Sequence, residues 1–228
     1  LSITIGRSTP SISLTSTTAV NTMNVGTTLS ITSTSIPTPP GGTVLSTGVL
    51  TYSVVSGGGS ATINSSTGLL TALSSGQVVV QAVQGADVNY YASTQGSFTV
   101  TIGAGVQVLS LTSSIGNYVT IVGGSLIVTG SSNVVGGGAI TYGLSTIGAG
   151  SATIDAVTGF VTGNAAGSVL LTAYTAGNAN YQSASITQVL TINKASQTLS
   201  IALSSTVLVG SSLTFTATST APFGQGGA

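Results

Sequence analysis

The segment TYSVVSGGGSATINSSTGLLTALSSGQVVVQAVQ, residues 51–84, recurs as TYGLSTIGAGSATIDAVTGFVTGNAAGSVLLTAYT, residues 141–175, with one residue inserted in the glycine loop. Each copy alternates short runs of Val, Leu, Ile and Thr with clusters of Gly, Ser and Asn, which favour turns. Alternation with a period of two indicates strands that bury one face. The segment therefore predicts two copies of one strand-rich domain.

The repeat extends beyond this segment in both directions. TIGRSTPSISLTS from Thr4 aligns with TIGAGVQVLSLTS from Thr101, and a third copy opens at TINKASQTLSIAL from Thr191. Downstream, GADVNYYAS is matched by AGNANYQSAS, so that Tyr181 follows Tyr90 by 91 residues. A spacing of this size is typical of a small all-β domain rather than of one coil of a solenoid.

Each complete copy contains about seven short strands, which is the signature of an immunoglobulin-like sandwich. The chain has no Cys and no Trp, unlike an antibody domain. Low-complexity disorder is disfavoured, because hydrophobic residues make up 41% of the chain and recur with a period of two. We predict an all-β fold of tandem immunoglobulin-like β-sandwich domains arranged as a rod. The predicted strands are 11–16, 26–34, 48–55, 60–64, 68–73, 76–84 and 96–103 in the first copy, 106–113, 123–130, 138–144, 151–155, 158–162, 167–175 and 186–193 in the second, and 197–203 and 211–219 in the third.

The alignment also gives the expected domain organisation. Residues 1–5 match the last strand of a preceding unit, 6–103 form repeat 1, 104–193 form repeat 2, and 194–228 hold the first strands of an incomplete repeat 3. Isolated pairs of strands are marginally stable in water, so the terminal pieces need neighbours. We expect these residues to belong to a longer repeat protein; the alternative is that neighbouring subunits complete the sheets by strand addition.

The chain is almost uncharged. Its ordinary charged side chains are Arg7, Asp87, Asp155 and Lys194, whereas a typical soluble domain has about a quarter of its residues charged. Ser and Thr supply the polar surface instead. Free sheet edges are usually protected by charges or proline, and only SIPTPPGG, residues 35–42, carries a proline cluster. A neutral, strand-rich surface of this kind favours lateral and edge-to-edge association.

The same composition argues against several classes of function. General acid–base catalysis needs paired carboxylates or a histidine, but Asp87 and Asp155 lie in different copies and the chain has no His. Calcium prefers several carboxylate oxygens and zinc prefers Cys or His, so we expect no metal and no cofactor. Two cations do not form the basic footprint that nucleic acid requires. No apolar run approaches the roughly 20 residues of a membrane-spanning helix. We therefore predict no catalytic residues.

The candidate site residues belong to the repeated Asn-Tyr phrase. We expect them to be structural turn and cap residues, and they are Asp87, Asn89, Tyr90, Asn178, Asn180 and Tyr181. Asp87 or Asn178 can hydrogen-bond its own backbone to hold a turn, and the tyrosine can cover the end of the sandwich. The functional alternative is a tyrosine-rich tip that contacts a sugar or a surface. The repetition favours the structural interpretation, because a folding device is needed once per domain.

One glycosylation sequon, Asn64-Ser65-Ser66, lies on a predicted turn. Asn64 is therefore a candidate glycan acceptor in an exported protein, although such a triplet is expected by chance in a chain rich in Ser and Thr. Asp155 takes the equivalent place in the second copy, where SATIDAVTG parallels SATINSSTG. We interpret Asp155 as a turn residue.

The order of the repeated blocks resembles a known family. The blocks TY-S, SATI(N/D), TG-(L/F)-(L/V)-T, G-x-V-x-(V/L)-x-A and G-x-(D/N)-x-NY, followed by a strand and TINKASQTLSI, are similar to the immunoglobulin-like tandem repeats of bacterial surface and extracellular proteins. The resemblance covers essentially the whole chain. It implies an exported protein in which repeats are strung as rods, as in adhesins, S-layer-associated proteins and extracellular filaments.

These observations predict a non-enzymatic structural repeat protein that forms or decorates an extracellular filament, sheath or cell-surface fibre. The expected partners are further copies of itself, as a homopolymer or a longer repeat array, and cell-surface or glycan ligands. Neither nucleic acid nor a membrane span is expected. Two alternatives remain open: the stalk or binding module of a bacterial cell-surface adhesin, and an immunoglobulin-like decoration module of a phage or other virion. As a filament protein or as an adhesin module, the chain is expected to be extracellular or on the cell surface.

Overall fold

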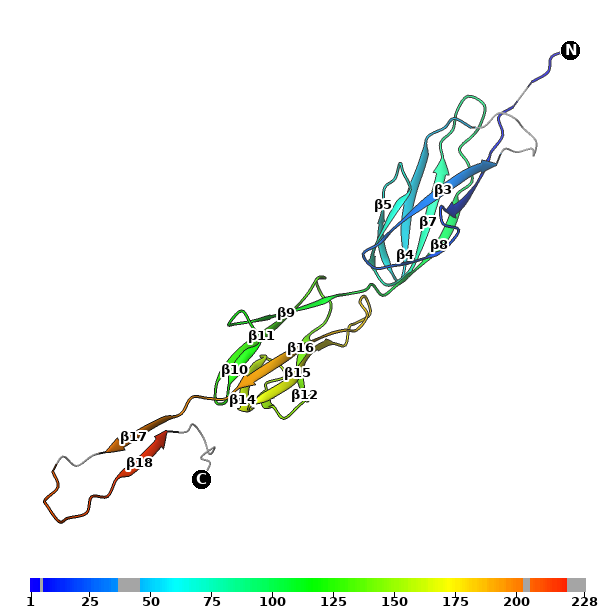
Figure 1. The fold of residues 1–228 in the computed structure, drawn as a ribbon. Coiled ribbons are helices and arrows are strands. Elements are labelled where there is room, and N and C mark those ends of the chain that lie inside the picture. The colour runs from blue at the N-terminus through cyan, green and yellow to red at the C-terminus, as the bar shows by residue number, and fades with distance from the viewer. Residues whose placement is uncertain (5, 37–45, 203–205, 221–228) are drawn as a thin grey trace. The chain divides into compact units, whose positions relative to one another are not determined.

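A computed structural model describes residues 1–4, 6–36, 46–202 and 206–220. The proline cluster falls mostly on residues 37–42, which lie outside the described residues, as do residues 5, 203–205 and 221–228 of the predicted terminal pieces. In the described ranges every regular element is a strand (Figure 1).

The chain divides into two compact units. Unit 1 comprises Leu1–Gln107 together with Gly177–Ser183, and unit 2 comprises Val108–Ala176 together with Ala184–Ala228. Residues 104–107 and Gly177–Ser183, which the alignment places in the second sequence copy, therefore belong to unit 1.

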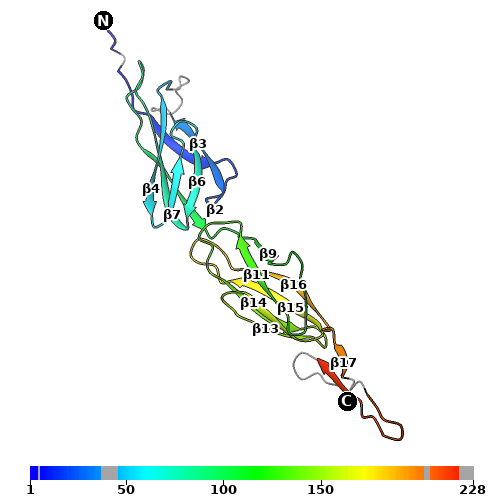
Figure 2. The ribbon, with the colours of Figure 1, turned by 90° about the vertical axis from the view of Figure 1, so that its left-hand side faces the viewer.

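Unit 1 is a sandwich of two four-stranded sheets. One sheet has the order β1-β3-β6-β5 and the other the order β2-β8-β7-β4, so that β3 and β6 form one layer and β4 and β7 the other (Figure 2). All pairs are antiparallel except the short β2, which runs parallel to β8. These are the strand orders of an immunoglobulin-like sandwich with a split first strand. The strands are β1 (Ser11–Ser16), β2 (Thr22–Asn24), β3 (Thr28–Ile36), β4 (Leu50–Gly57), β5 (Ser60–Ile63), β6 (Leu69–Ser74), β7 (Gly76–Gln84) and β8 (Gly96–Gly103).

Unit 2 repeats this topology. Its sheets have the orders β9-β11-β14-β13 and β10-β16-β15-β12, and β10 again pairs in parallel with the last strand. An antiparallel pair, β17 (Thr198–Ala202) and β18 (Thr216–Thr220), follows. The sandwich strands are β9 (Leu109–Ser113), β10 (Val119–Ile121), β11 (Ser125–Ser132), β12 (Ile140–Thr146), β13 (Ser151–Ile154), β14 (Phe160–Ala165), β15 (Gly167–Thr175) and β16 (Ala184–Asn193).

The core of each unit follows from the alternation in its central strands. Along β7, Val78, Val80 and Ala82 are buried, while the residues between them face outward. Strands buried on one face carry this period because successive side chains point to opposite sides of the sheet. The fully buried large side chains are Ile31, Leu70, Val78, Val80 and Val100 in unit 1 and Val128, Val161, Val169, Leu171, Leu190 and Ile192 in unit 2.

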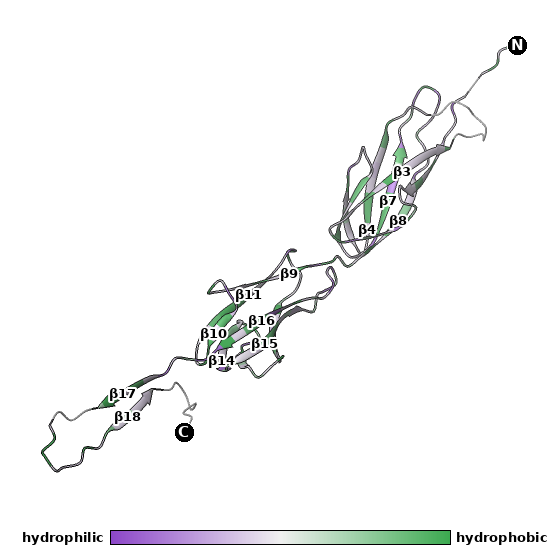
Figure 3. Cartoon of the chain, in the orientation of Figure 1, coloured by the Kyte–Doolittle hydropathy of each residue, from purple (hydrophilic) through white to green (hydrophobic). Residues whose placement is uncertain are grey.

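The pair β17–β18 has the register of the first pair in each sandwich. Leu199 lies opposite Ser219 just as Ile12 of β1 lies opposite Ser35 of β3. The environment of the pair differs, however, because Leu199 is 69% exposed whereas Ile12 is 9% exposed. Figure 3 shows hydrophobic residues in part of β17. This ladder therefore forms in the described chain without a core beneath it.

Candidate functional site: the Asn-Tyr turns

The first Asn-Tyr turn is organised by one carboxylate. Asp87 Oδ1 accepts hydrogen bonds from the backbone N–H groups of Asn89 and Tyr90, both at 2.8 Å. Asp87 Oδ2 accepts from the N–H of Thr47 at 2.6 Å and from the hydroxyl of Ser46 at 3.1 Å. The Asp87 side chain therefore holds its own turn and also ties it to the segment before β4.

These donors lower the pKa of Asp87 well below its ordinary value. The Thr47 N–H has the largest effect on this pKa, and desolvation, the second largest, opposes it. The N–H groups of Asn89 and Tyr90 and the Ser46 hydroxyl add to the lowering. Hydrogen bonds to the charged form stabilise that form. The turn thus holds an ionised carboxylate at neutral pH, and its role in these contacts is that of an acceptor.

The second Asn-Tyr turn reproduces the first without charge. Asn178 Oδ1 accepts from the N–H groups of Asn180 and Tyr181 at 2.8 and 3.0 Å. The Asn178 N–H donates to the Tyr181 carbonyl at 2.8 Å, as the Asp87 N–H donates to the Tyr90 carbonyl at 3.0 Å. An Asn or Asp at this position can serve equally because either offers one side-chain oxygen to two successive N–H groups.

This second turn contacts the sandwich of unit 1, to which it belongs. Asn180 Oδ1 accepts from the N–H of Ser75, in the bend between β6 and β7, at 2.9 Å. The Asn180 carbonyl accepts from the N–H of Gly105 at 2.8 Å, and the Gln182 N–H donates to the Gly105 carbonyl at 2.9 Å. Gln107, which is buried, donates from Nε2 to the Gln182 carbonyl at 2.6 Å.

The Tyr181 side chain is packed against the hydrophobic core of unit 1. It lies beside Gly105, where an added Cβ would be 3.4 Å from the Tyr181 ring but only 2.5 Å from the carbonyl oxygen of Val25. A residue with a side chain does not fit there without moving the backbone. Glycine at position 105 therefore permits the close approach of three segments at this end of unit 1.

A second pair of turns joins β5 to β6 and β13 to β14. Asn64 Oδ1 accepts from the N–H groups of Ser66 and Thr67 at 3.0 and 2.9 Å. Asp155 Oδ1 accepts from Val157 and Thr158 at 2.9 and 2.7 Å, and these donors, Thr158 first, lower the pKa of Asp155. The candidate glycan acceptor thus has its carbonyl oxygen engaged in an exposed turn, with its amide nitrogen not used in those two bonds.

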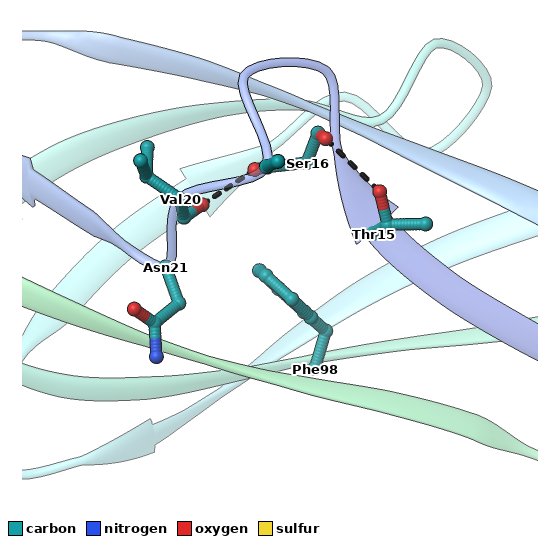
Figure 4. Close-up of a pocket in the computed structure, with 6 residues that line it drawn as sticks. Thr15, Ser16, Val20, Asn21 and Phe98 are labelled. Carbon is teal, nitrogen blue, oxygen red and sulfur yellow. Dashed lines mark hydrogen bonds between the residues drawn. The ribbon is translucent and has the colours of Figure 1, made fainter.

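An open pocket of about 340 Å³ lies at the β1–β2 connection of unit 1. Figure 4 shows Phe98 and Asn21 facing it, with the Ser16 hydroxyl donating to the Val20 carbonyl and the Thr15 hydroxyl donating to the Ser16 carbonyl at 3.0 Å. Its lining, completed by Ala19, contains no charged group.

Within the described ranges, no cluster of three or more His, Cys, Asp or Glu residues could hold a metal ion. Nor do these ranges contain a helix long and apolar enough to cross a membrane.

Comparison with known proteins gave structural similarity alone. No protein-family model matches the chain, and no curated protein matches it in sequence. Among solved structures, human protocadherin-24 EC1-2 is 12% identical with a TM-score of 0.34, covering 80% of this chain and 97% of its own. A C-terminal fragment of intimin, in complex with the intimin-binding domain of the translocated intimin receptor, is 18% identical with a TM-score of 0.32, covering 84% and 66%. Drosophila N-cadherin EC1-3 is 14% identical with a TM-score of 0.29, covering 75% and 62%.

The structure assembles the predicted residues into two separate groups of contacts. Asp87, Asn89 and Tyr90 form the first turn, and Asn178, Asn180 and Tyr181 form the second. Sequence reasoning missed Ser75, Gly105 and Gln107, which contact the second turn. A glycine at position 105 where the first copy has Ser8 was the available signal, but nothing in the local pattern linked it to residues more than 70 positions later.

Proposed function

We propose that the chain is a non-enzymatic structural repeat protein that forms or decorates an extracellular filament, sheath or cell-surface fibre, in association with further copies of itself. In this proposal residues 6–103 and 104–193 are two repeats of an array, and residues 1–5 and 194–228 are parts of neighbouring repeats. The observation that carries the proposal is the uncharged outer surface of the sheets.

The outward faces of the strands are built from hydroxyls and apolar side chains. Ser110 and Ser131 pair through their hydroxyl oxygens at 2.7 Å across β9 and β11, and the Thr112 hydroxyl donates to the Thr129 carbonyl at 3.3 Å. Between such groups lie exposed apolar residues, among them Leu69 and its counterpart Phe160, which are 42% and 47% exposed. These side chains can pack against a second sheet without burying a charge.

The scarcity of charge decides how such surfaces behave toward one another. Sheet edges and faces normally carry charges that keep copies apart. With two basic and two acidic side chains in 228 residues, the chain has little long-range repulsion to overcome and few ion pairs to screen. Association through these surfaces should therefore depend weakly on ionic strength and pH. A small-molecule binding role has less support, because the pocket beside Phe98 is open and lacks a charged group.

The test combines imaging of the native chain with a matched pair of variants. Negative-stain microscopy and light scattering at low and at high salt should show regular fibres whose amount changes little with salt. Thr62 and Thr153 are exposed at equivalent positions on β5 and β13. Changing both to Lys should weaken association and make it depend on salt, whereas changing both to Gln should preserve it. A monomeric native chain, or fibres that dissolve on a change of salt alone, would refute the proposal. The intact mass also reveals any glycan on Asn64.

A further inference from the structure

Unit 1 is not made from the first sequence copy alone. Its residues include Gly177–Ser183, although the copy to which unit 1 corresponds ends before Val108. The first copy contains its own Asn-Tyr turn at residues 85–93, which follows the last residue of β7, whereas Gly177–Ser183 contacts Ser75 just before the first residue of β7. Unit 1 therefore holds one such turn at each end of this strand. The presence of two turns calls for a physical account of what the added one does.

The two turns have the same internal hydrogen bonds but different surroundings. Asn89 and Asn180 both donate their backbone N–H to the side chain two residues earlier, at 2.8 Å. The side chain of Asn89 is exposed, whereas Asn180 is half-buried and its Oδ1 accepts from Ser75. The first turn is held by other segments of unit 1, because the Tyr91 N–H donates to the Ser8 carbonyl at 2.9 Å and the Thr47 N–H donates to Asp87 Oδ2. In the second turn, the contact with Ser75 uses the side-chain oxygen of Asn180, which the internal bonds of that turn do not use.

The docking surface on unit 1 offers complementary groups at short range. It presents the N–H groups of Ser75 and Gly105 to the Asn180 side chain and carbonyl, and it presents the edge of the hydrophobic core to the Tyr181 ring. The absence of a side chain at Gly105 provides the necessary room. The Ser75 N–H beside the apolar core edge favours an Asn followed by an aromatic residue, because the Asn180 side-chain oxygen accepts from this N–H while the Tyr181 ring buries apolar surface.

We infer that Ser75 and the adjacent core edge of unit 1 form a docking site for an Asn-x-Asn-Tyr turn, and that the following sequence copy supplies its occupant. Gly105, which belongs to that following copy, leaves the room for the turn. The first repeat is then completed by the repeat after it. The second copy then stabilises the copy on its N-terminal side through Asn180 and Tyr181. In repeat proteins such nearest-neighbour terms add to the stability of each unit. The inference rests on the contacts of unit 1 and is independent of the proposed function.

Amide-resolved hydrogen exchange by NMR on the full chain tests the inference. Asn180→Ala removes the side-chain acceptor of the Ser75 N–H and should accelerate exchange of the Ser75 amide by about two- to tenfold, the factor that corresponds to one net hydrogen bond. Asn180→Asp keeps an acceptor oxygen and should stay within about twofold of the native rate. Asn89→Ala is the matched control, because it changes the equivalent residue of the first turn, and should leave Ser75 unaffected.

Tyr181→Ala should accelerate exchange at Ser75 and in the adjoining ends of β6 and β7 by more than Asn180→Ala does, whereas Tyr181→Phe retains the ring and should have little effect. Unchanged Ser75 exchange in both Asn180→Ala and Tyr181→Ala would overturn the inference, as would an equal effect of Asn89→Ala. Should Tyr181→Ala disturb the folding of unit 2, the comparison of Asn180→Ala with Asn180→Asp decides the question. None of these outcomes bears on the salt dependence of fibres, so the two proposals fail separately.

Discussion

Gly68→Ala should destabilise unit 1 through a steric conflict that the structure locates. Gly68 has a φ of +70° at the end of the Asn64 turn, and its carbonyl accepts from the N–H of Ile31 at 3.0 Å. An added Cβ would lie 2.3 Å from the Ile31 carbonyl oxygen and 3.0 Å from the Tyr52 ring. The neighbour is backbone in the buried part of β3, so it cannot move aside without disturbing the sheet.

The magnitude has two parts. The left-handed conformation costs alanine about 1–2 kcal/mol, and opening the Ile31–Gly68 hydrogen bond to relieve the contact costs about 0.5–1.5 kcal/mol more. For a unit of this size a loss of 1 kcal/mol lowers Tm by about 4–8 °C, so a fall of roughly 6–28 °C in the Tm of unit 1 is expected. Gly26→Ala is the matched control, because Gly26 has a φ of +84° with nothing within 4 Å of an added Cβ.

Differential scanning calorimetry on the full chain, with hydrogen exchange to assign each transition to its unit, measures both variants. Gly159→Ala provides a second test, since Gly159 has a φ of +71° and its added Cβ would lie 2.1 Å from the Val128 carbonyl oxygen in unit 2. That variant should lower the transition of unit 2 instead. The steric argument is wrong if Gly68→Ala and Gly26→Ala lower Tm by the same amount.

Three further outcomes are expected. The pKa of Asp87 is lowered in the folded chain, so its carboxylate stabilises unit 1 at pH values above its ordinary pKa of 3.8. This stabilisation is lost as the pH falls below that value. Calorimetry should therefore show a smaller acid-induced fall in Tm for Asp87→Asn than for the native chain. Asn64→Ala loses two turn hydrogen bonds and should lower the free energy of unfolding of unit 1 by about 1–3 kcal/mol in urea titrations, whereas Asn64→Asp should be nearly neutral because Asp155 makes the same two bonds. Leu171→Ala, at a fully buried position of β15, should cost unit 2 about 2–5 kcal/mol in the same assay, against about 0.5 kcal/mol for Val189→Ala at an exposed one, and comparable losses would show that the core is misassigned.

The all-β sandwich could be predicted from sequence because most of its strands show a local alternation of apolar and polar residues. The predicted strand 76–84 coincides with β7, where alternating Val and Ala fill the core and Gly begins the strand. The structure adds one strand to each sandwich, β2 and β10. Each has three residues, too few to show a period, and each is held by parallel pairing with a strand more than 60 positions away. Such pairing depends on the assembled fold rather than on the segment itself.

The Asn-Tyr turns were predictable for a similar reason, and their contacts were not. An Asp or Asn that accepts from residues two and three positions later is a local property of the segment. The hydrogen bond between Asn180 and Ser75 spans 105 positions, and neither residue type singles out the other. The tyrosine was expected to cover the end of the sandwich, but the sequence contained no indication that Tyr181 packs against the core of the unit that precedes its own copy.

The register of β17 and β18 bears on how such a chain avoids tangling. Copies of similar sequence allow strands of one copy to pair with those of another, which is a characteristic failure of repeat proteins. The pair Leu199–Ser219 forms in the same alignment as Ile12–Ser35 while its apolar side chains are still uncovered. We therefore expect the residues of the first two strands to specify their alignment without the later strands of the copy. During synthesis, the first two strands of each new copy can then pair with each other. The later strands of the same copy add to this existing pair.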